Sequence, residues 1–163
     1  MAKVNAKDQR AVNVVARNRR ARFEYEIFDT YEAGIALLGP EVKSLREGRA
    51  NLSDAYALIR RGEVFLQNLH ISPYQWAGRD NPSATRERKL LLHRREIGRL
   101  TAKLNERGFT LVPLQLYFKD GRAKVELGLA RGKRLHDKRE TIRQRESDRD
   151  LQRAMRGRGR SRS

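Results

Sequence analysis

The alternation of apolar and polar residues ends near residue 131, and charged residues follow almost without interruption. In the segment VELGLARGKRLHDKRE, Val125, Leu127 and Leu129 alternate with polar residues or glycine, as in a β-strand with one buried face. Residues 131–163 hold thirteen Lys or Arg, five acids and few apolar side chains. Burying so little cannot offset an ordering cost of about 1–2 kcal/mol per residue. We therefore expect a basic tail over residues 131–163 that is disordered in isolation and partly helical on a polyanion, ending in RGRGRSRS without structure.

The net charge of +17 is concentrated at both ends of the chain. Residues 1–20 carry six Lys or Arg and one acid, which leaves a net charge of +4 for residues 21–130. Basic ends on an ordinary domain indicate a polyanionic partner, either a nucleic acid or an anionic membrane surface. No segment approaches the ~20 apolar residues that span a bilayer, and residues 1–10 lack the apolar run of a secretory signal. We therefore expect a cytoplasmic protein that does not bind membranes.

Residues 17–130 are expected to form one domain, preceded by a flexible basic segment over residues 1–16. The sequence predicts antiparallel strands and two or three helices, with no βαβ alternation. The strand patterns cover residues 22–38, 55–60, 63–71, 110–118 and 122–130, and the helical patterns cover 39–49 and 93–108. Gly34 is expected at a bulge or a close backbone approach, and Pro113 at an edge or a bulge. The fold class is thus mainly β, as a small barrel or sandwich with flanking helices.

Candidate catalytic residues are scattered. His70, His93 and His136 stand in no metal-binding spacing, and the absence of cysteine excludes disulfides and zinc sites with Cys ligands. Four acids between Glu24 and Glu32 suggest a metal-dependent nuclease, but solvated strand positions explain them better. We expect no catalysis, no metal and no cofactor.

RNA binding has stronger support from the residues. Arginines precede the first predicted strand, and a second basic cluster surrounds the run KLLL at residues 89–92; such side chains neutralise phosphates. Trp76 lies in a polar loop, where an aromatic ring can stack on a base. Core packing explains the strand tyrosines better than stacking does.

Three long segments also resemble a known family: RRARFEYEIFDTYEAGIALLGPEVKSLREGRANLSDAYA, RKLLLHRREI and TLVPLQLYFKDGRAKVELGLARGKRLHDKR. From residue 17 to about 143 the chain is similar to the SmpB (small protein B) family of SsrA-binding proteins. The resemblance implies an oligonucleotide-binding (OB-type) barrel and a monomeric, non-catalytic factor of trans-translation. Such a factor binds transfer-messenger RNA (tmRNA, or SsrA) and delivers it, with elongation factor Tu and GTP, to ribosomes stalled on mRNA without a stop codon.

The resemblance implies two functional surfaces. The barrel surface would bind the tRNA-like domain of tmRNA through Asn18, Arg19, Glu32, Ala33, Gly34, Lys89, Leu91 and Lys124. The tail would occupy the ribosomal decoding centre and the empty mRNA channel through Lys133, Arg134, His136, Asp137, Lys138, Arg139, Ile142, Arg143 and Arg145. The last eight residues and the loop around Trp76 do not match the family pattern. A structural ribosomal protein with basic tails is the alternative reading.

Overall fold

The structure is a computed structural model that describes residues 12–133 and 135–160, with only the backbone described for 135–141 and 156–160. Its main sheet contains β1 (Val12–Arg17), β2 (Tyr25–Ile35), β4 (Tyr56–Arg60), β5 (Glu63–Gln67), β7 (Arg88–Leu91), β8 (Phe109–Lys119) and β9 (Arg122–Gly132). A small second sheet pairs β3 (Ala50–Asn51) with β6 (His70–Ile71). The helices are α1 (Arg19–Glu24), α2 (Gly39–Arg46), α3 (Arg94–Leu104), α4 (Leu135–Arg160) and the short 3-10 helix η2 (Gly78–Asp80).

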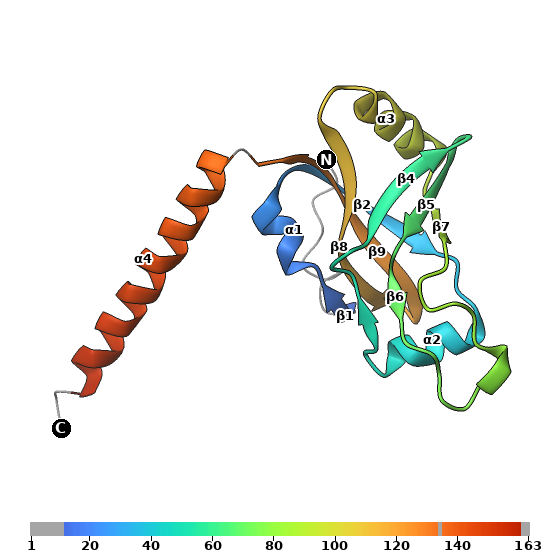
Figure 1. Cartoon of the computed structure of the whole chain (residues 1–163), viewed down its shortest axis with the longest axis horizontal. Coiled ribbons are helices and arrows are strands. Elements are labelled where there is room, and N and C mark those ends of the chain that lie inside the picture. Colours follow the sequence, from blue (N-terminus) through green and yellow to red (C-terminus); the bar gives the residue numbers. More distant parts are fainter. Residues whose placement is uncertain (1–11, 134, 161–163) are drawn as a thin grey trace.

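The main sheet closes on itself. Its neighbours run β8, β4, β5, β7, β2 and β9, and β9 pairs again with β8, always antiparallel. Inward-facing leucines such as Leu66, Leu111 and Leu127 are fully buried inside this ring. Helices α2 and α3 lie at opposite ends of the barrel (Figure 1) and contribute Leu45 and Leu100 to the core. The predicted small antiparallel barrel with flanking helices is confirmed.

Local turn chemistry sets the register of two hairpins. Arg61 and Gly62 join β4 to β5, and Asp120 and Gly121 join β8 to β9; all four have positive φ angles, which two-residue hairpin turns require. Pro113 precedes a register shift between β8 and β9, because proline cannot donate a ladder hydrogen bond. The predicted bulge at Pro113 is confirmed.

Residues 12–16, which were expected to belong to the flexible segment before the domain, lie in β1. This strand adds to the free edge of β8 next to β4, a long-range pairing that its short apolar run does not reveal. Arg22–Glu24, expected in a strand, are the end of α1, which the Asn18 side chain caps. Residues 1–11, which belong to the segment expected to be flexible, lie outside the described residues.

The main sheet also extends past the domain boundary expected at residue 130. Strand β9 runs to Gly132, and the N–H of Lys133 donates to the carbonyl of Glu24 at 2.9 Å. The tail then forms α4, which projects away from the barrel (Figure 1). The prediction that RGRGRSRS has no structure is wrong for residues 156–160, which continue α4; residues 161–163 lie outside the described residues.

Helix formation in the tail has a local cause. The segment contains no proline and many Arg, Glu, Gln, Leu and Met residues, which favour helices. Residues 142–155 are nevertheless all exposed, so the tail is not part of the core, as predicted. That it acquires this helix only on a polyanion stays a prediction. None of the described helices is both long and apolar enough to cross a membrane.

Candidate RNA-binding groove

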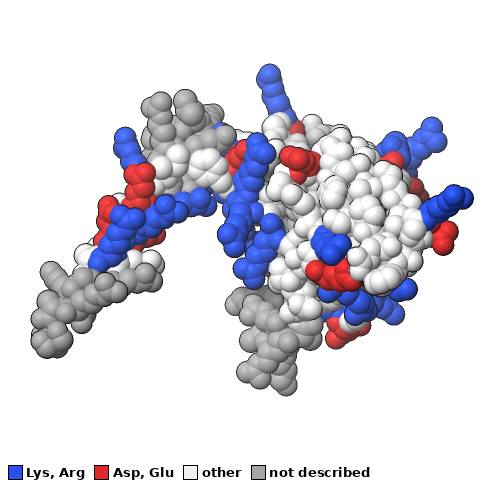
Figure 2. Space-filling model, turned by 60° about the horizontal axis from the view of Figure 1, so that its bottom comes forward, with Lys and Arg blue, Asp and Glu red and all other residues white. Residues whose placement is uncertain are grey.

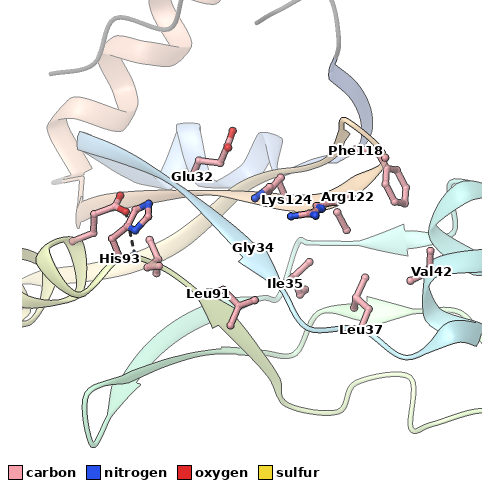
Figure 3. Close-up of a pocket in the computed structure, with 14 residues that line it drawn as sticks. Glu32, Gly34, Ile35, Leu37, Val42, Leu91, His93, Phe118, Arg122 and Lys124 are labelled. Atoms are coloured by element: carbon pink, nitrogen blue, oxygen red, sulfur yellow. Dashed lines mark hydrogen bonds between the residues drawn. The ribbon is translucent and has the colours of Figure 1, made fainter.

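A groove of about 560 Å³ runs along the barrel from the start of α3 to α2 (Figure 3). It is bounded by β2, β7, α2 and the turn between β8 and β9. Four of the residues predicted to bind RNA line it: Glu32, Gly34, Leu91 and Lys124. Residues from three strands far apart in the sequence thus meet in one concave surface.

Gly34 and Leu91 form the floor of the groove. Gly34 pairs with Leu91 across β2 and β7 and with Lys124 across β2 and β9. A Cβ atom on Gly34 would lie 3.3 Å from the Leu91 Cβ, tighter than ordinary packing. Gly34 was expected at a bulge or a close backbone approach, but it is paired on both sides within β2, and its close neighbour is the Leu91 side chain. Leu91 is 55% exposed, so it offers an apolar surface that a base could cover.

Glu32 lies at the rim of the groove, and two side chains of β8 fix the orientation of its carboxylate. The Tyr117 hydroxyl donates to Glu32 Oε2 at 2.5 Å, and Lys119 Nζ lies 3.5 Å from the same oxygen. Burial and this hydrogen bond raise the pKa of Tyr117, so the phenol stays protonated and keeps donating. No described residue donates to Glu32 Oε1, and the side chain is 41% exposed. This oxygen can accept from a base amino group or a ribose hydroxyl.

Cations border the groove on the β9 side. Lys124 and Arg122 line it from the same face of β9, because strand side chains alternate with a period of two. Neither forms an ion pair with the described residues. Sequence reasoning missed Arg122, although its position two residues before Lys124 on the same strand contained the signal.

His93 was also missed as a groove residue. It precedes α3 and lines the groove together with Glu96, and its N–H donates to Glu96 Oε1 at 3.3 Å (Figure 3). His93 is therefore the N-cap residue of α3, and its backbone N–H is bound by the side chain of Glu96, the third residue of the helix. Only the position of His93 directly after the run KLLL could have indicated this place.

Two predicted contact residues, Asn18 and Ala33, are buried. Asn18 is buried: its Nδ2 donates to the Pro113 carbonyl at 2.9 Å, and its Oδ1 accepts from the Ala21 N–H at 3.1 Å. Its side chain anchors α1 to β8. Ala33 is fully buried in the core, because it alternates with the outward-facing Glu32 and Gly34. Ala33 is therefore shielded from solvent in this structure, and its predicted role in RNA binding stays a prediction.

Two further predicted residues lie outside the groove. Arg19 lines a separate hollow of about 270 Å³ with Arg17 and Arg22, and none of the three forms an ion pair with a described residue. Figure 2 shows Lys and Arg side chains gathered between α4 and the barrel. Lys89 is exposed on β7, and its Nζ lies 3.0 Å from Glu63. The exposed Lys89 and the arginines of this hollow can therefore contact phosphates.

The outer face of the sheet connects the groove to the arginine hollow. Strand pairing places Glu32 opposite Glu126, Glu126 opposite Gln115, and Gln115 opposite Arg17. Gln115 Nε2 donates to Glu126 Oε2 at 2.6 Å. This polar row crosses β2, β9, β8 and β1 between the groove and the arginine hollow.

A buried ion cluster holds α2 against β7. Glu41 is 2% exposed and accepts from Arg86, from Arg88 Nε at 2.6 Å and from the Leu38 N–H at 3.0 Å. The guanidinium of Arg88 also donates to the Leu69 carbonyl. Burial lowers the pKa of Arg88, although its bonds to Glu41 oppose this shift. The cluster fixes the two elements that carry Val42 and Leu91 into the groove.

The predicted ribosome-binding residues lie on or before α4. Ile142, Arg143 and Arg145 are exposed, and the Arg145 guanidinium lies 5.6 Å from the Phe23 ring of α1. Lys133 is half-buried where the tail leaves the barrel. The predicted contact Arg134 lies outside the described residues, as do the side chains of His136, Asp137, Lys138 and Arg139.

Chemistry other than binding has little support in this site. Among the residues that the structure describes, no group of three His, Asp or Glu side chains could hold a metal ion. The acids of β2 that suggested a nuclease do not converge: Glu32 binds Tyr117, and Asp29 Oδ1 accepts from the Thr30 N–H. Exposed cations, an oriented carboxylate and an apolar floor fit a surface that binds a polyanion.

Comparison with known proteins agrees with this geometry. The family model described as "SmpB protein" matches residues 15–157. The chain is 59% identical over 143 residues to the SsrA-binding protein of Gloeothece citriformis (87% of this chain, 92% of that protein). It is 52% identical over 147 residues to that of Syntrophotalea carbinolica (90% and 98%).

A solved structure described as "tmRNA-SmpB: a journey to the center of the bacterial ribosome" is also similar. It superimposes with a TM-score of 0.64 at 51% identity and covers 78% of this chain and 94% of that one. The family model spans most of the chain, and the relatives are matched over nearly their whole length. Both comparisons indicate the same family. The chain belongs to the SmpB family of SsrA-binding proteins.

Proposed function

We propose that this protein binds the tRNA-like domain of tmRNA and brings it to ribosomes stalled on mRNA without a stop codon, in trans-translation. The names of its relatives, SsrA-binding proteins, and the tmRNA-SmpB structure support this role. The observation that carries the proposal is the groove in which Glu32, Gly34, Leu91 and Lys124 converge. The protein acts as a monomer in the cytoplasm and without a catalytic step of its own.

The groove and the tail would have separate roles in this function. The groove accepts a structured RNA: Glu32 receives a hydrogen bond, Leu91 covers an unstacked base, and Lys124 neutralises a phosphate. Arg19 and Lys89 add phosphate contacts beside it, and Asn18 acts indirectly by anchoring α1.

The tail enters the ribosome. Helix α4 is exposed and basic, and it stands clear of the barrel (Figure 1). Such a helix suits a narrow channel of phosphates that is vacant only when the message has run out. His136, Asp137, Lys138 and Arg139 would meet the decoding nucleotides, while Ile142, Arg143 and Arg145 would follow into the channel. Elongation factor Tu with GTP would travel on the same RNA.

Binding measurements on Glu32→Ala test the groove. A hydrogen bond to a charged group contributes about 1.5–3 kcal/mol, so affinity for the tRNA-like domain should fall about 10- to 150-fold. Glu106→Ala, which removes an exposed carboxylate that pairs with Lys103 at the end of α3, is the matched control and should bind normally. Equal weakening of the tRNA-like RNA and an unrelated duplex by Glu32→Ala would remove Glu32 from the specific contact.

Ribosome fractionation separates this role from that of a structural ribosomal protein with basic tails. A constitutive component would be stoichiometric on all ribosomes. A rescue factor should be enriched on ribosomes stalled at the end of a truncated message.

A further inference from the structure

Trp76 is the most exposed large hydrophobic side chain of the described residues, at 77% exposure. It lies in the segment that joins β6 to β7, and it is the single tryptophan of the chain. An indole ring contributes more to stability when buried than almost any other side chain. Packing within this domain therefore does not account for Trp76.

The loop that carries Trp76 is held in shape by its own hydrogen bonds. Asn81 Nδ2 donates to the carbonyls of Tyr74 and Gly78 at 2.9 and 3.1 Å, and the Tyr74 N–H donates to Asn81 Oδ1 at 2.9 Å. The Ala77 N–H also donates to the Tyr74 carbonyl at 3.0 Å. Trp76 is thus presented from an ordered turn, which lowers the entropy cost of placing a ligand on its ring.

Helix α2 lies between this loop and the groove. On the loop side, Lys43 Nζ lies 5.5 Å from the Tyr74 ring centre, and the Ser44 hydroxyl donates to the Ser72 carbonyl at 2.5 Å. On the other side, Val42 lines the groove. A ligand that leaves the groove over α2 meets the Trp76 loop next.

The charges around the loop favour a polyanion. Lys43 and Arg79 are exposed, and neither of them forms an ion pair with the described residues. Asp80 is the one acid of residues 72–86. An exposed aromatic ring flanked by cations is the pattern of single-stranded nucleic-acid contacts, in which the ring stacks on a base and the cations neutralise phosphates.

We propose that Trp76 stacks on an unpaired nucleobase of RNA and forms a second RNA contact beyond the groove, separated from it by α2. The inference rests on the proposed function, because RNA is the partner in both. The base comes either from tmRNA or from ribosomal RNA. Both sources supply the same chemistry: a flat base whose backbone runs past Lys43 and Arg79.

Tryptophan fluorescence of the full chain tests this directly, because Trp76 is its single tryptophan. In the titration with ribosomes, the Trp76 signal is the difference between the original protein and Trp76→Phe, because ribosomal proteins contain tryptophans of their own. One titration uses the isolated tRNA-like domain of tmRNA, and the other uses stalled ribosomes without tmRNA. Stacking should quench the fluorescence in one of the two titrations. Trp76→Ala should weaken binding in the same titration about 5- to 150-fold, whereas Trp76→Phe, which keeps an aromatic face, should lose less.

Salt dependence separates stacking from charge. Trp76→Ala should leave the slope of log affinity against log salt unchanged, while Lys43→Ala should reduce it by about 0.7–0.9 for one lost phosphate contact. Trp76→Ala should also melt like the original protein, because the ring is exposed.

Three results would overturn the inference: unchanged fluorescence in both titrations, Trp76→Ala binding within twofold of the original protein in both, or a cross-link from position 76 to a ribosomal protein instead of RNA. If only the Trp76 contact is wrong, Glu32→Ala should still bind the tRNA-like domain more weakly than the original protein does. Failure of the proposed function would instead abolish specific binding to the tRNA-like domain by the original protein.

Discussion

Replacing Glu41 with glutamine should destabilise the barrel more than any comparable change of a surface acid. Glu41 is almost fully buried and neutralises the wholly buried guanidinium of Arg88 and the partly buried Arg86. Glutamine keeps the size and one carbonyl oxygen but removes the negative charge. Arg88 would retain its hydrogen bond to the Leu69 carbonyl and lose its counter-charge.

The magnitude follows from burial. Breaking a buried ion pair by removing one partner costs about 3–5 kcal/mol, a large part of the ~5–15 kcal/mol that stabilises a typical domain. The exposed pair of Lys89 and Glu63 gives the contrast, since both side chains are about half exposed and such pairs contribute about 0–1 kcal/mol. Glu63→Gln is therefore the matched control.

Urea unfolding followed by circular dichroism measures both variants. With a slope of about 2 kcal/mol per molar urea, Glu41→Gln should lower the unfolding midpoint by about 2 M, and Glu63→Gln by less than about 0.5 M. If Glu41→Gln unfolds within about 1 kcal/mol of the original protein, the ion cluster does not hold α2 against β7 and the reasoning is refuted.

Acid unfolding gives an independent measure of the same cluster. Burial alone would raise the pKa of Glu41, but hydrogen bonds from Arg86, the Leu38 N–H and Arg88 lower it below the ordinary value of 4.5. A group whose pKa is lower in the folded state stabilises the fold above its unfolded pKa and loses that contribution as the pH falls through the folded pKa. The original protein should therefore lose stability below about pH 4.5 that Glu41→Gln does not lose.

Three other predictions address the RNA surfaces. Tyr117→Phe should weaken binding to the tRNA-like domain when Glu32 is present and have little effect in a Glu32→Ala background, as measured by a double-mutant cycle; additive effects would separate the two residues. Gly34→Ala should reduce RNA affinity severalfold with a small change in melting temperature, because its Cβ would lie 3.3 Å from the Leu91 Cβ; normal affinity would mean that the groove floor is not a contact. Truncation after Lys133 should leave affinity for the tRNA-like domain within severalfold and abolish peptide tagging on stalled ribosomes, whereas truncation after Ala130 should also lower the melting temperature by cutting β9; loss of RNA affinity after Lys133 would contradict two separate surfaces.

The elements that the sequence predicted well are those fixed by local chemistry. The turns at Arg61–Gly62 and Asp120–Gly121 require positive φ angles within two residues, and glycine marks both. Strand β1 was missed because its stability depends on pairing with β8, about a hundred residues away. Helix α1 was missed because its six residues are stabilised by the buried Asn18. The Asn18 side chain donates to the carbonyls of Pro113 and Leu52, which are far away in the sequence.

The same distinction applies to the site. Family resemblance supplied Glu32, Ala33 and Gly34 as one group, but a strand turns successive side chains to opposite faces. Glu32 and Gly34 therefore face the groove while Ala33 fills the core, and the period of two in β2 was sufficient to separate them. Arg122 beside Lys124 follows from the same rule. What no local pattern contains is the orientation of the Glu32 carboxylate, because Tyr117 and Lys119 of β8 reach it across β9 only after β2 has paired with β9. The orientation of this proposed RNA contact thus depends on long-range strand pairing as much as on the residue that would make the contact.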